Sequence, residues 1–343
     1  MTVETRNAWV GSTDWRETVP PGEDALFRSF GEEIRAMQAA RAAKTGKMAR
    51  ALHVKPHVGV KAELTILDVP PQLRVGPFAE QRTYSAYVRF SNGSAFAQSD
   101  RRPDLRGVAV KLLDVPGKKL IPGLEDARTQ DFLLIPTAAL ATGTPAEFMD
   151  LLRAGKAGPA LVVPRLFWFC GFARAMKLLK VFGSMPTVKS VATCRFHSGA
   201  PIRFGDYAAK LDLVPVGEGS DGESKDPFGP DGVRADLISR LARGPIAYTL
   251  RAQLYVDAVS TPIEDASVLW PEAISPFIEL ARLTLPQQDV ASPEGQELER
   301  LVEALSFDPW HAVETLRPLG AIMRSRAHAY RESVLARSAA PEP

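Results

Sequence analysis

A tyrosine near the end of the sequence is flanked by arginines at helical spacing. Arg326, Tyr330 and Arg337 occupy positions i, i+4 and i+11 of a segment patterned as a helix. Because eleven residues make about three turns, their side chains can share one face. Positive charge close to a phenol favours its ionised form and lowers its pKa from the usual value of about 10, and a phenolate oxygen is a known axial ligand of haem iron. On spacing alone, an arginine-rich surface helix with structural ion pairs is the more frequent arrangement.

Histidine, cysteine and glycine form none of the common catalytic patterns. The five histidines include no His-Glu-x-x-His pair, which argues against a hydrolytic zinc site. Cys170 and Cys194 have no near partner, so we expect no disulfide framework and no cysteine-based metal centre, and a reduced, cytoplasmic setting fits best. Cys170 lies in an apolar segment, where a buried free thiol is commoner than a thiolate haem ligand.

Residues 217–222 match a dinucleotide-binding fingerprint, but a proline-containing loop follows them instead of a helix, so nucleotide binding is not expected.

The composition is that of a globular protein. Of the 343 residues, 45% are hydrophobic and 24% charged, which is enough apolar material for a large core. A net charge of +2 gives no general electrostatic reason to expect a nucleic-acid partner. The N-terminus lacks the basic stretch and apolar run of a secretory signal, and no segment reaches eighteen uncharged apolar residues, so no membrane-spanning helix is expected.

The elements that must position these residues are short strands and amphipathic helices. Residues 1–22 read as an extended N-terminal arm. Alternating patterns predict strands at 58–67, 84–90, 108–113, 132–135, 191–196, 208–214, 247–256 and 277–285, and helical patterns occur at 23–44, 146–154, 233–243, 296–305 and 318–335. Many of the connections are too short for crossover helices, which favours antiparallel pairing. We therefore expect an α+β protein built on an antiparallel β-barrel of about eight strands, with surrounding helices and a C-terminal helix.

Several motifs resemble those of haem catalases, in the same order along the chain. Arg50-Ala51-Leu52-His53-Val54-Lys55 resembles the distal-histidine segment, and Val88-Arg89-Phe90-Ser91 followed by Asp104-Leu105-Arg106-Gly107-Val108-Ala109-Val110-Lys111 resembles the next conserved run. Further matches are Glu264-Asp265, Trp270-Pro271, residues 276–280, residues 307–309, and Arg326-x-x-x-Tyr330 with Arg337 seven residues beyond. Since the sequence stops soon after Arg337, it is similar to the short catalase-related peroxidase, or minicatalase, branch. The resemblance implies a single catalase-like haem-binding domain over 23–343.

The resemblance also implies roles for individual residues, with haem b as the cofactor. Tyr330 would be the axial ligand of the haem iron, and Arg326 would donate a hydrogen bond that keeps its phenol ionised. His53 would act as the distal acid–base residue, with Ser91 hydrogen-bonded to its ring.

Three further arginines would bind the haem propionates: Arg50, Arg89 and Arg337. The alternative for each arginine is an ordinary solvated charge. We prefer His53 to His57 as the distal base, because the preceding arginine and the following lysine keep their family spacing only for His53, and His57 is expected to be structural.

The function implied is that of a haem-dependent peroxidase or catalase-like enzyme that reduces hydrogen peroxide or organic hydroperoxides with a small-molecule reductant. The alternatives are a fatty-acid hydroperoxide isomerase or lyase of the allene oxide synthase type, and a non-catalytic barrel that binds haem or a hydrophobic ligand. The chain departs from the family pattern on the distal side, where Arg128 stands at the position of an asparagine. A distal arginine there would favour peroxidase over catalase chemistry.

The segment 159–182 is apolar and aromatic with basic residues at intervals. This pattern is typical of an interfacial helix that contacts a membrane surface weakly. A buried helix, or a contact in a homo-oligomer, is the commoner explanation for such a pattern.

Overall fold

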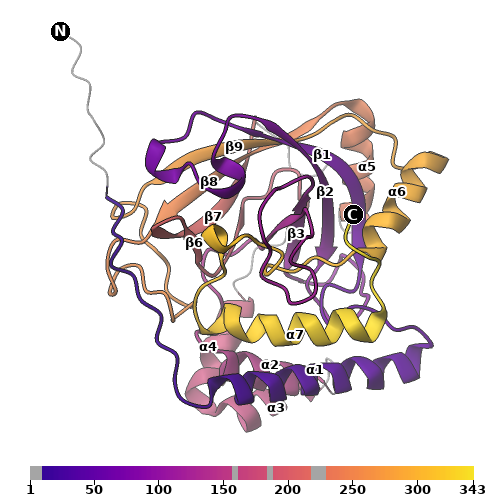
Figure 1. Cartoon of the computed structure of the whole chain (residues 1–343). Helices are drawn as coiled ribbons and strands as arrows, with labels where there is room; N and C mark the ends of the chain where they lie inside the picture. Colours follow the sequence, from indigo (N-terminus) through magenta and orange to yellow (C-terminus); the bar gives the residue numbers. More distant parts are fainter. Residues whose placement is uncertain (1–9, 157–160, 184–187, 218–228) are drawn as a thin grey trace.

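The structure is a computed structural model that describes residues 10–156, 161–183, 188–217 and 229–343. Its centre is an antiparallel sheet whose strands follow the order β4-β3-β2-β1-β9-β8-β7-β5, with β6 paired to β7 (Figure 1). The strands are β1 (Pro56–Ile66), β2 (Thr83–Asn92), β3 (Arg106–Leu112), β4 (Gln130–Leu134), β5 (Phe196–His197), β6 (Ile202–Phe204), β7 (Tyr207–Pro215), β8 (Ile246–Leu254) and β9 (Phe277–Leu285). Ile135 and His197 exchange backbone hydrogen bonds of 2.8 and 2.7 Å, which brings the two ends of the sheet together. The expected antiparallel barrel is thereby confirmed.

Alternation along the strands separates the barrel core from its outer face. In β1, the side chains of Val60, Ala62, Leu64 and Ile66 are buried, whereas Lys61, Glu63 and Thr65 between them are exposed. The largest buried rings in the core belong to Phe78, Phe90, Phe196, Phe204 and Tyr248. This interior is filled mainly by apolar side chains.

Five of the seven helices that follow, α1 to α4 and α7, lie on one side of the barrel (Figure 1). The helices are α1 (Glu23–Thr45), α2 (Pro145–Gly155), α3 (Val162–Cys170), α4 (Phe172–Gly183), α5 (Gly232–Arg243), α6 (Pro293–Ala304) and α7 (Ala321–Arg337). Helix α7 runs between the barrel and α1 (Figure 1). Gly31 of α1 allows this close approach, because a Cβ atom there would lie 3.2 Å from the backbone of His328. Helices α5 and α6 contact β1 instead.

The N-terminal arm is held against the body of the protein. The Trp15 indole donates to the carbonyl of Asp206 at 2.8 Å, and the Thr18 amide donates to Glu264 at 2.9 Å. The Arg324 guanidinium of α7 pairs with Glu17 of the arm and with Glu264. The arm therefore ties the start of α7 to the barrel.

Two sequence predictions about elements were wrong. The expected strand 191–196 is reduced to β5, because Val191 is buried in a turn where its carbonyl accepts a 2.7 Å hydrogen bond from the Tyr248 hydroxyl instead of from a neighbouring strand. The expected single helix at 159–182 is two helices, since Gly171 has a φ of +73° that ends α3.

Candidate functional site

Tyr330 and Arg326 form a pair on α7. The Arg326 Nη2 donates to the Tyr330 hydroxyl oxygen at 2.9 Å, and its guanidinium carbon lies 5.1 Å from the centroid of the tyrosine ring. The Nη1 of the same guanidinium lies 3.3 Å from the sulfur of buried Met323. The helical spacing therefore produces the predicted contact between the guanidinium and the hydroxyl oxygen.

His53 is held in place by backbone and side-chain contacts. Its Nδ1 lies 3.0 Å from the Ser91 hydroxyl, its amide donates to the carbonyl of Gly93 at 3.1 Å, and its carbonyl accepts a 2.9 Å hydrogen bond from Arg89. Its φ of +55° lies in the left-handed region, which is costly for a residue with a side chain and occurs often at functional sites. Space for the imidazole comes from Gly107, where a Cβ atom would lie 2.6 Å from Cε1 of the ring.

The charge state of His53 is set by burial and by arginines. Desolvation, followed by the positive charges of Arg89, Arg326 and Arg50, lowers the pKa of His53 to about 3. The imidazole is therefore neutral at neutral pH and can accept a proton. Because Arg326 affects both residues, it links Tyr330 on α7 to His53 on the barrel side.

Arg50, Arg89 and Arg337 meet at the C-terminal end of α6. Arg89 binds the Glu303 carboxylate at 2.7 Å, and Arg50 approaches it at 3.4 Å. Arg50 and Arg337 also donate to the carbonyl of Leu305 at 2.9 and 2.6 Å. Burial and the neighbouring charge of Arg89 lower the pKa of Arg50 to about 9. Two guanidinium groups thus share the Glu303 carboxylate, and the third, that of Arg337, contacts backbone carbonyls at the same helix end. Three cations and one carboxylate leave an excess of positive charge suited to an anionic ligand.

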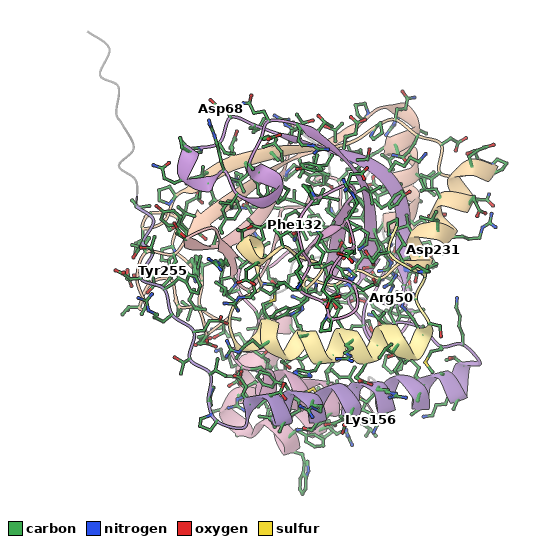
Figure 2. All side chains as sticks on the ribbon, viewed as in Figure 1. Arg50, Asp68, Phe132, Lys156, Asp231 and Tyr255 are labelled. Atoms are coloured by element: carbon green, nitrogen blue, oxygen red, sulfur yellow. The ribbon has the colours of Figure 1, made fainter. Side chains whose placement is uncertain are left out.

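These residues lie on α7 and on the segments next to it. All residues from Arg324 to Tyr330 keep partial exposure, although α7 lies between the barrel and α1. The amide of Ala51 lies 3.3 Å from the Ser333 hydroxyl of α7, and Figure 2 shows Arg50 beside this helix. The seven predicted site residues therefore gather where α7, the end of α6 and the segment 50–53 meet. A phenol, an imidazole and surplus guanidinium groups fit an iron porphyrin with two carboxylates.

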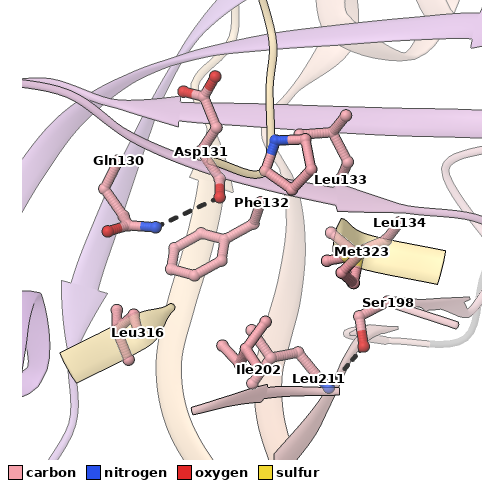
Figure 3. Close-up of a pocket in the computed structure, with 11 residues that line it drawn as sticks. Gln130, Asp131, Phe132, Leu133, Leu134, Ser198, Ile202, Leu211, Leu316 and Met323 are labelled. Carbon is pink, nitrogen blue, oxygen red and sulfur yellow. Dashed lines mark hydrogen bonds between the residues drawn. The ribbon is translucent and has the colours of Figure 1, made fainter. Parts of the chain in front are cut away.

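A small cavity adjoins the site beneath the start of α7. It has a volume of about 20 Å³ and is lined mainly by apolar side chains, including Phe132, Leu316 and Met323 (Figure 3). This volume holds about one water-sized molecule. Among the described residues, no group of three or more His, Cys, Asp or Glu side chains could bind a bare metal ion.

Arg128 does not belong to the site. Its side chain is 61% exposed and pairs with Asp114 at 3.4 Å, so the condition for an effect of Arg128 on the chemistry, that it reaches the distal side, is not met. Arg128 lies in the connection before β4, where its carbonyl accepts a 2.9 Å hydrogen bond from the Val115 amide.

Three other residues considered from the sequence lie elsewhere. His57 is fully buried beside Asn92, with Nε2 to Oδ1 at 2.7 Å, and burial lowers its pKa to about 4, as suits a structural residue. His328 faces Asp24 of α1 at 3.2 Å. Cys170 is buried among α2, α3 and α4, where burial raises the pKa of its thiol. Most of the 217–222 run falls outside the described residues.

Two residues of the site were not identified from the sequence. Gly107 was part of a quoted motif, but its role as the space for His53 depends on the fold. Glu303 had no recognisable signal, because a carboxylate near the end of an amphipathic helix is common.

Comparison of the sequence with family models and with curated proteins gives no match. The structure is similar to a fungal catalase, with a TM-score of 0.67, 16% identity, and coverage of 87% of this chain and 61% of that one. It is also similar to catalase A from Saccharomyces cerevisiae, with a TM-score of 0.67, 13% identity, and coverage of 97% and 68%. A bacterial catalase gives a TM-score of 0.61, 16% identity, and coverage of 87% and 59%. The chain thus spans about 60% of the length of the fungal and bacterial structures. The resemblance read from the sequence is confirmed at the level of structure: this chain has a catalase-like fold.

Proposed function

We propose that the protein is a haem-dependent peroxidase that reduces hydrogen peroxide or organic hydroperoxides with a small-molecule reductant. The observation that carries the proposal is the position of Arg326, which bonds the Tyr330 phenol and is close enough to His53 to lower its pKa. The Arg326 guanidinium thus acts on both Tyr330, whose phenol can ligate iron, and His53, whose imidazole can transfer a proton. The catalase-like fold supports the same conclusion.

The chain offers residues for each part of a haem b molecule. Tyr330 would ligate the iron through its oxygen, and Arg326 would keep that oxygen anionic. Arg50, Arg89 and Arg337 would bind the two propionates, whose charges match the surplus left by Glu303. Bound haem supplies the redox-active iron at which peroxide reacts.

His53 would move the proton. In the tautomer whose Nδ1 donates to Ser91, Nε2 is unprotonated and would accept the proton of a hydroperoxide. The nearby arginines disfavour a charged imidazole, so the proton passes readily to the departing oxygen. The overall reaction converts a hydroperoxide, two electrons from the reductant and two protons into an alcohol and water.

The test is to load the protein with haem and to compare Tyr330→Phe with Tyr84→Phe. Tyr84 is the matched control, because an arginine also lies over its ring, 4.2 Å from the centroid. We expect a tyrosinate-type haem spectrum and peroxide-dependent oxidation of a reductant, both lost in Tyr330→Phe and kept in Tyr84→Phe. An unchanged spectrum and turnover in Tyr330→Phe would refute the proposal.

Product analysis separates the alternatives. Haem binding without turnover indicates a non-catalytic haem barrel. Consumption of a fatty-acid hydroperoxide without oxidation of a reductant indicates an isomerase or lyase.

A further inference from the structure

The turn between α3 and α4 carries exposed aromatic side chains. Trp168 near the end of α3 is 84% exposed, and Phe172 at the start of α4 is 74% exposed. Gly171 between them makes the sharp turn, and the rings of Phe167 and Phe172 lie 5.6 Å apart across it. Leu161 and Met176 add further apolar surface, at 52% and 47% exposure. Large apolar groups gathered at one exposed place indicate a binding surface.

This surface is not needed to hold the helices together. Leu166, Cys170, Ala175 and Leu178 are buried in a separate apolar cluster shared with α2. The exposed rings point away from that cluster, since they are among the least buried side chains of the described residues. Their apolar character therefore contributes little to the fold.

The charged side chains of the α3–α4 hairpin itself are all basic. Residues 151–205 contain nine lysines and arginines and no aspartate or glutamate. Lys177 and Lys180 on α4 are exposed, and neither has an ion-pair partner within the described part of the chain. Arg174 differs, because it pairs with Glu147 of α2 at 3.1 Å. The exposed rings thus lie beside uncompensated positive charge.

We propose that the α3–α4 hairpin is a docking surface for anionic lipid membranes. Tryptophan and phenylalanine insert at the boundary between headgroups and acyl chains, while lysines contact anionic headgroups. Docking is at the surface, because no helix among the described residues is long and apolar enough to cross a bilayer. A second copy of this chain fits less well, since a two-fold contact would bring the lysines of both copies together. The inference does not depend on haem binding or turnover.

The experiment is co-sedimentation of the protein with phosphatidylcholine vesicles, with and without phosphatidylglycerol. We expect binding only to the anionic vesicles, weakened by salt. Lys177→Gln combined with Lys180→Gln should lower the partition coefficient about 25-fold, at about fivefold for each lysine. Lys44→Gln combined with Lys47→Gln is the matched control, because these lysines are also exposed and three residues apart.

A second pair of variants tests insertion of the rings. Trp168→Ser combined with Phe172→Ser should abolish the blue shift of tryptophan emission on vesicle binding and lower binding at least about tenfold. Val259→Ser, which replaces a side chain that is 87% exposed elsewhere, should change neither.

Three results would overturn the proposal. These are equal binding to neutral vesicles, no binding to anionic vesicles, or unchanged binding by both hairpin variants. Conversion of a dimer to a monomer by Trp168→Ser with Phe172→Ser, without vesicle binding by the original protein, would assign the surface to self-association.

Discussion

Substitution of Gly107 by alanine is the sharpest test of the position of His53. An added Cβ atom would lie 2.6 Å from Cε1 and 2.8 Å from Nδ1 of the imidazole. Since carbon atoms approach comfortably to about 3.5 Å, the ring must retreat by about 0.9 Å. Gly107 lies on β3 opposite Ser91 of β2, so the ring is displaced from the hydroxyl that it contacts at 3.0 Å.

The expected loss is large in turnover and moderate in stability. Displacement by about 0.9 Å breaks the contact with Ser91, because a hydrogen bond does not survive much beyond 3.5 Å. A misplacement of about 1 Å in a catalytic group costs about 100-fold in rate. Overpacking of this kind lowers the free energy of unfolding by about 1–3 kcal/mol.

The assay is peroxide-dependent oxidation of a reductant by haem-loaded Gly107→Ala, with haem content and spectrum recorded in parallel. We expect kcat/KM to fall about 100-fold while the tyrosinate-type spectrum is kept. Gly11→Ala is the control. Its Cβ atom would also lie 2.6 Å from a side-chain atom, but this atom belongs to Leu254 and not to His53. Full activity in Gly107→Ala with the fold intact would show that proton transfer does not depend on His53.

Three further predictions concern stability. Glu342→Gln should lower the free energy of unfolding by about 1.5–3 kcal/mol in urea denaturation, because the carboxylate accepts charge-assisted hydrogen bonds in a buried site; an unchanged midpoint would contradict this. Burial raises the pKa of Asp308 to about 6, so the folded protein binds more protons than the unfolded chain between about pH 4 and 6. The free energy of unfolding therefore falls as pH rises through that window. Asp308→Asn should remove this slope and add about 2–3 kcal/mol to the free energy of unfolding at pH 7. Arg324→Met should release the N-terminal arm, measured as faster limited proteolysis within 10–22, with a loss of about 3–5 kcal/mol; proteolysis at the original rate would show that the arm is held by its other contacts.

The barrel was predictable because the polarity of each strand residue indicates whether its side chain is buried or exposed. In β1 and β9, alternation or continuous apolar character marks which side chains enter the core. β5 could not be predicted, since the apolar run around Val191 is buried by packing against Tyr248 and not by pairing with a strand. Local apolar character gives burial, but it does not identify the partner.

The site was predictable where spacing alone brings residues together. Arg326 and Tyr330 are four residues apart on one helix, so their contact follows from helical geometry. Arg89 and Glu303 are 214 residues apart, and only the packing of α6 against β1 and β2 joins them. The outward direction of the Arg128 side chain could not be predicted, because motif order carries no information on which loop side chains turn outward.

The outer face of β2, β3 and β4 also carries a buried polar cluster around Lys111, which lies two residues along β3 from the partner of Arg89. Lys111 is fully buried and contacts both Asp131, at 2.8 Å, and Glu342, at 2.7 Å. His311 lies 3.0 Å from Asp131 in the same cluster. The buried cation therefore has two carboxylate partners, and removal of Lys111 would leave buried negative charge uncompensated.

The arginine cluster on the same face contains more cations than carboxylates. Val302, Leu305 and Phe307 form an apolar cluster on this face, packed against side chains of β2, β3 and β4. Beyond them, Glu303 is the carboxylate partner of both Arg50 and Arg89. Surplus positive charge in a half-buried site is costly in the free protein, because the guanidinium groups repel one another and lose solvation. A dianionic ligand removes that cost, so its binding should raise the pKa of His53 as well as the free energy of unfolding. A neutral ligand of the same shape should bind more weakly, stabilise the fold less at the same concentration, and leave the pKa of His53 without that rise.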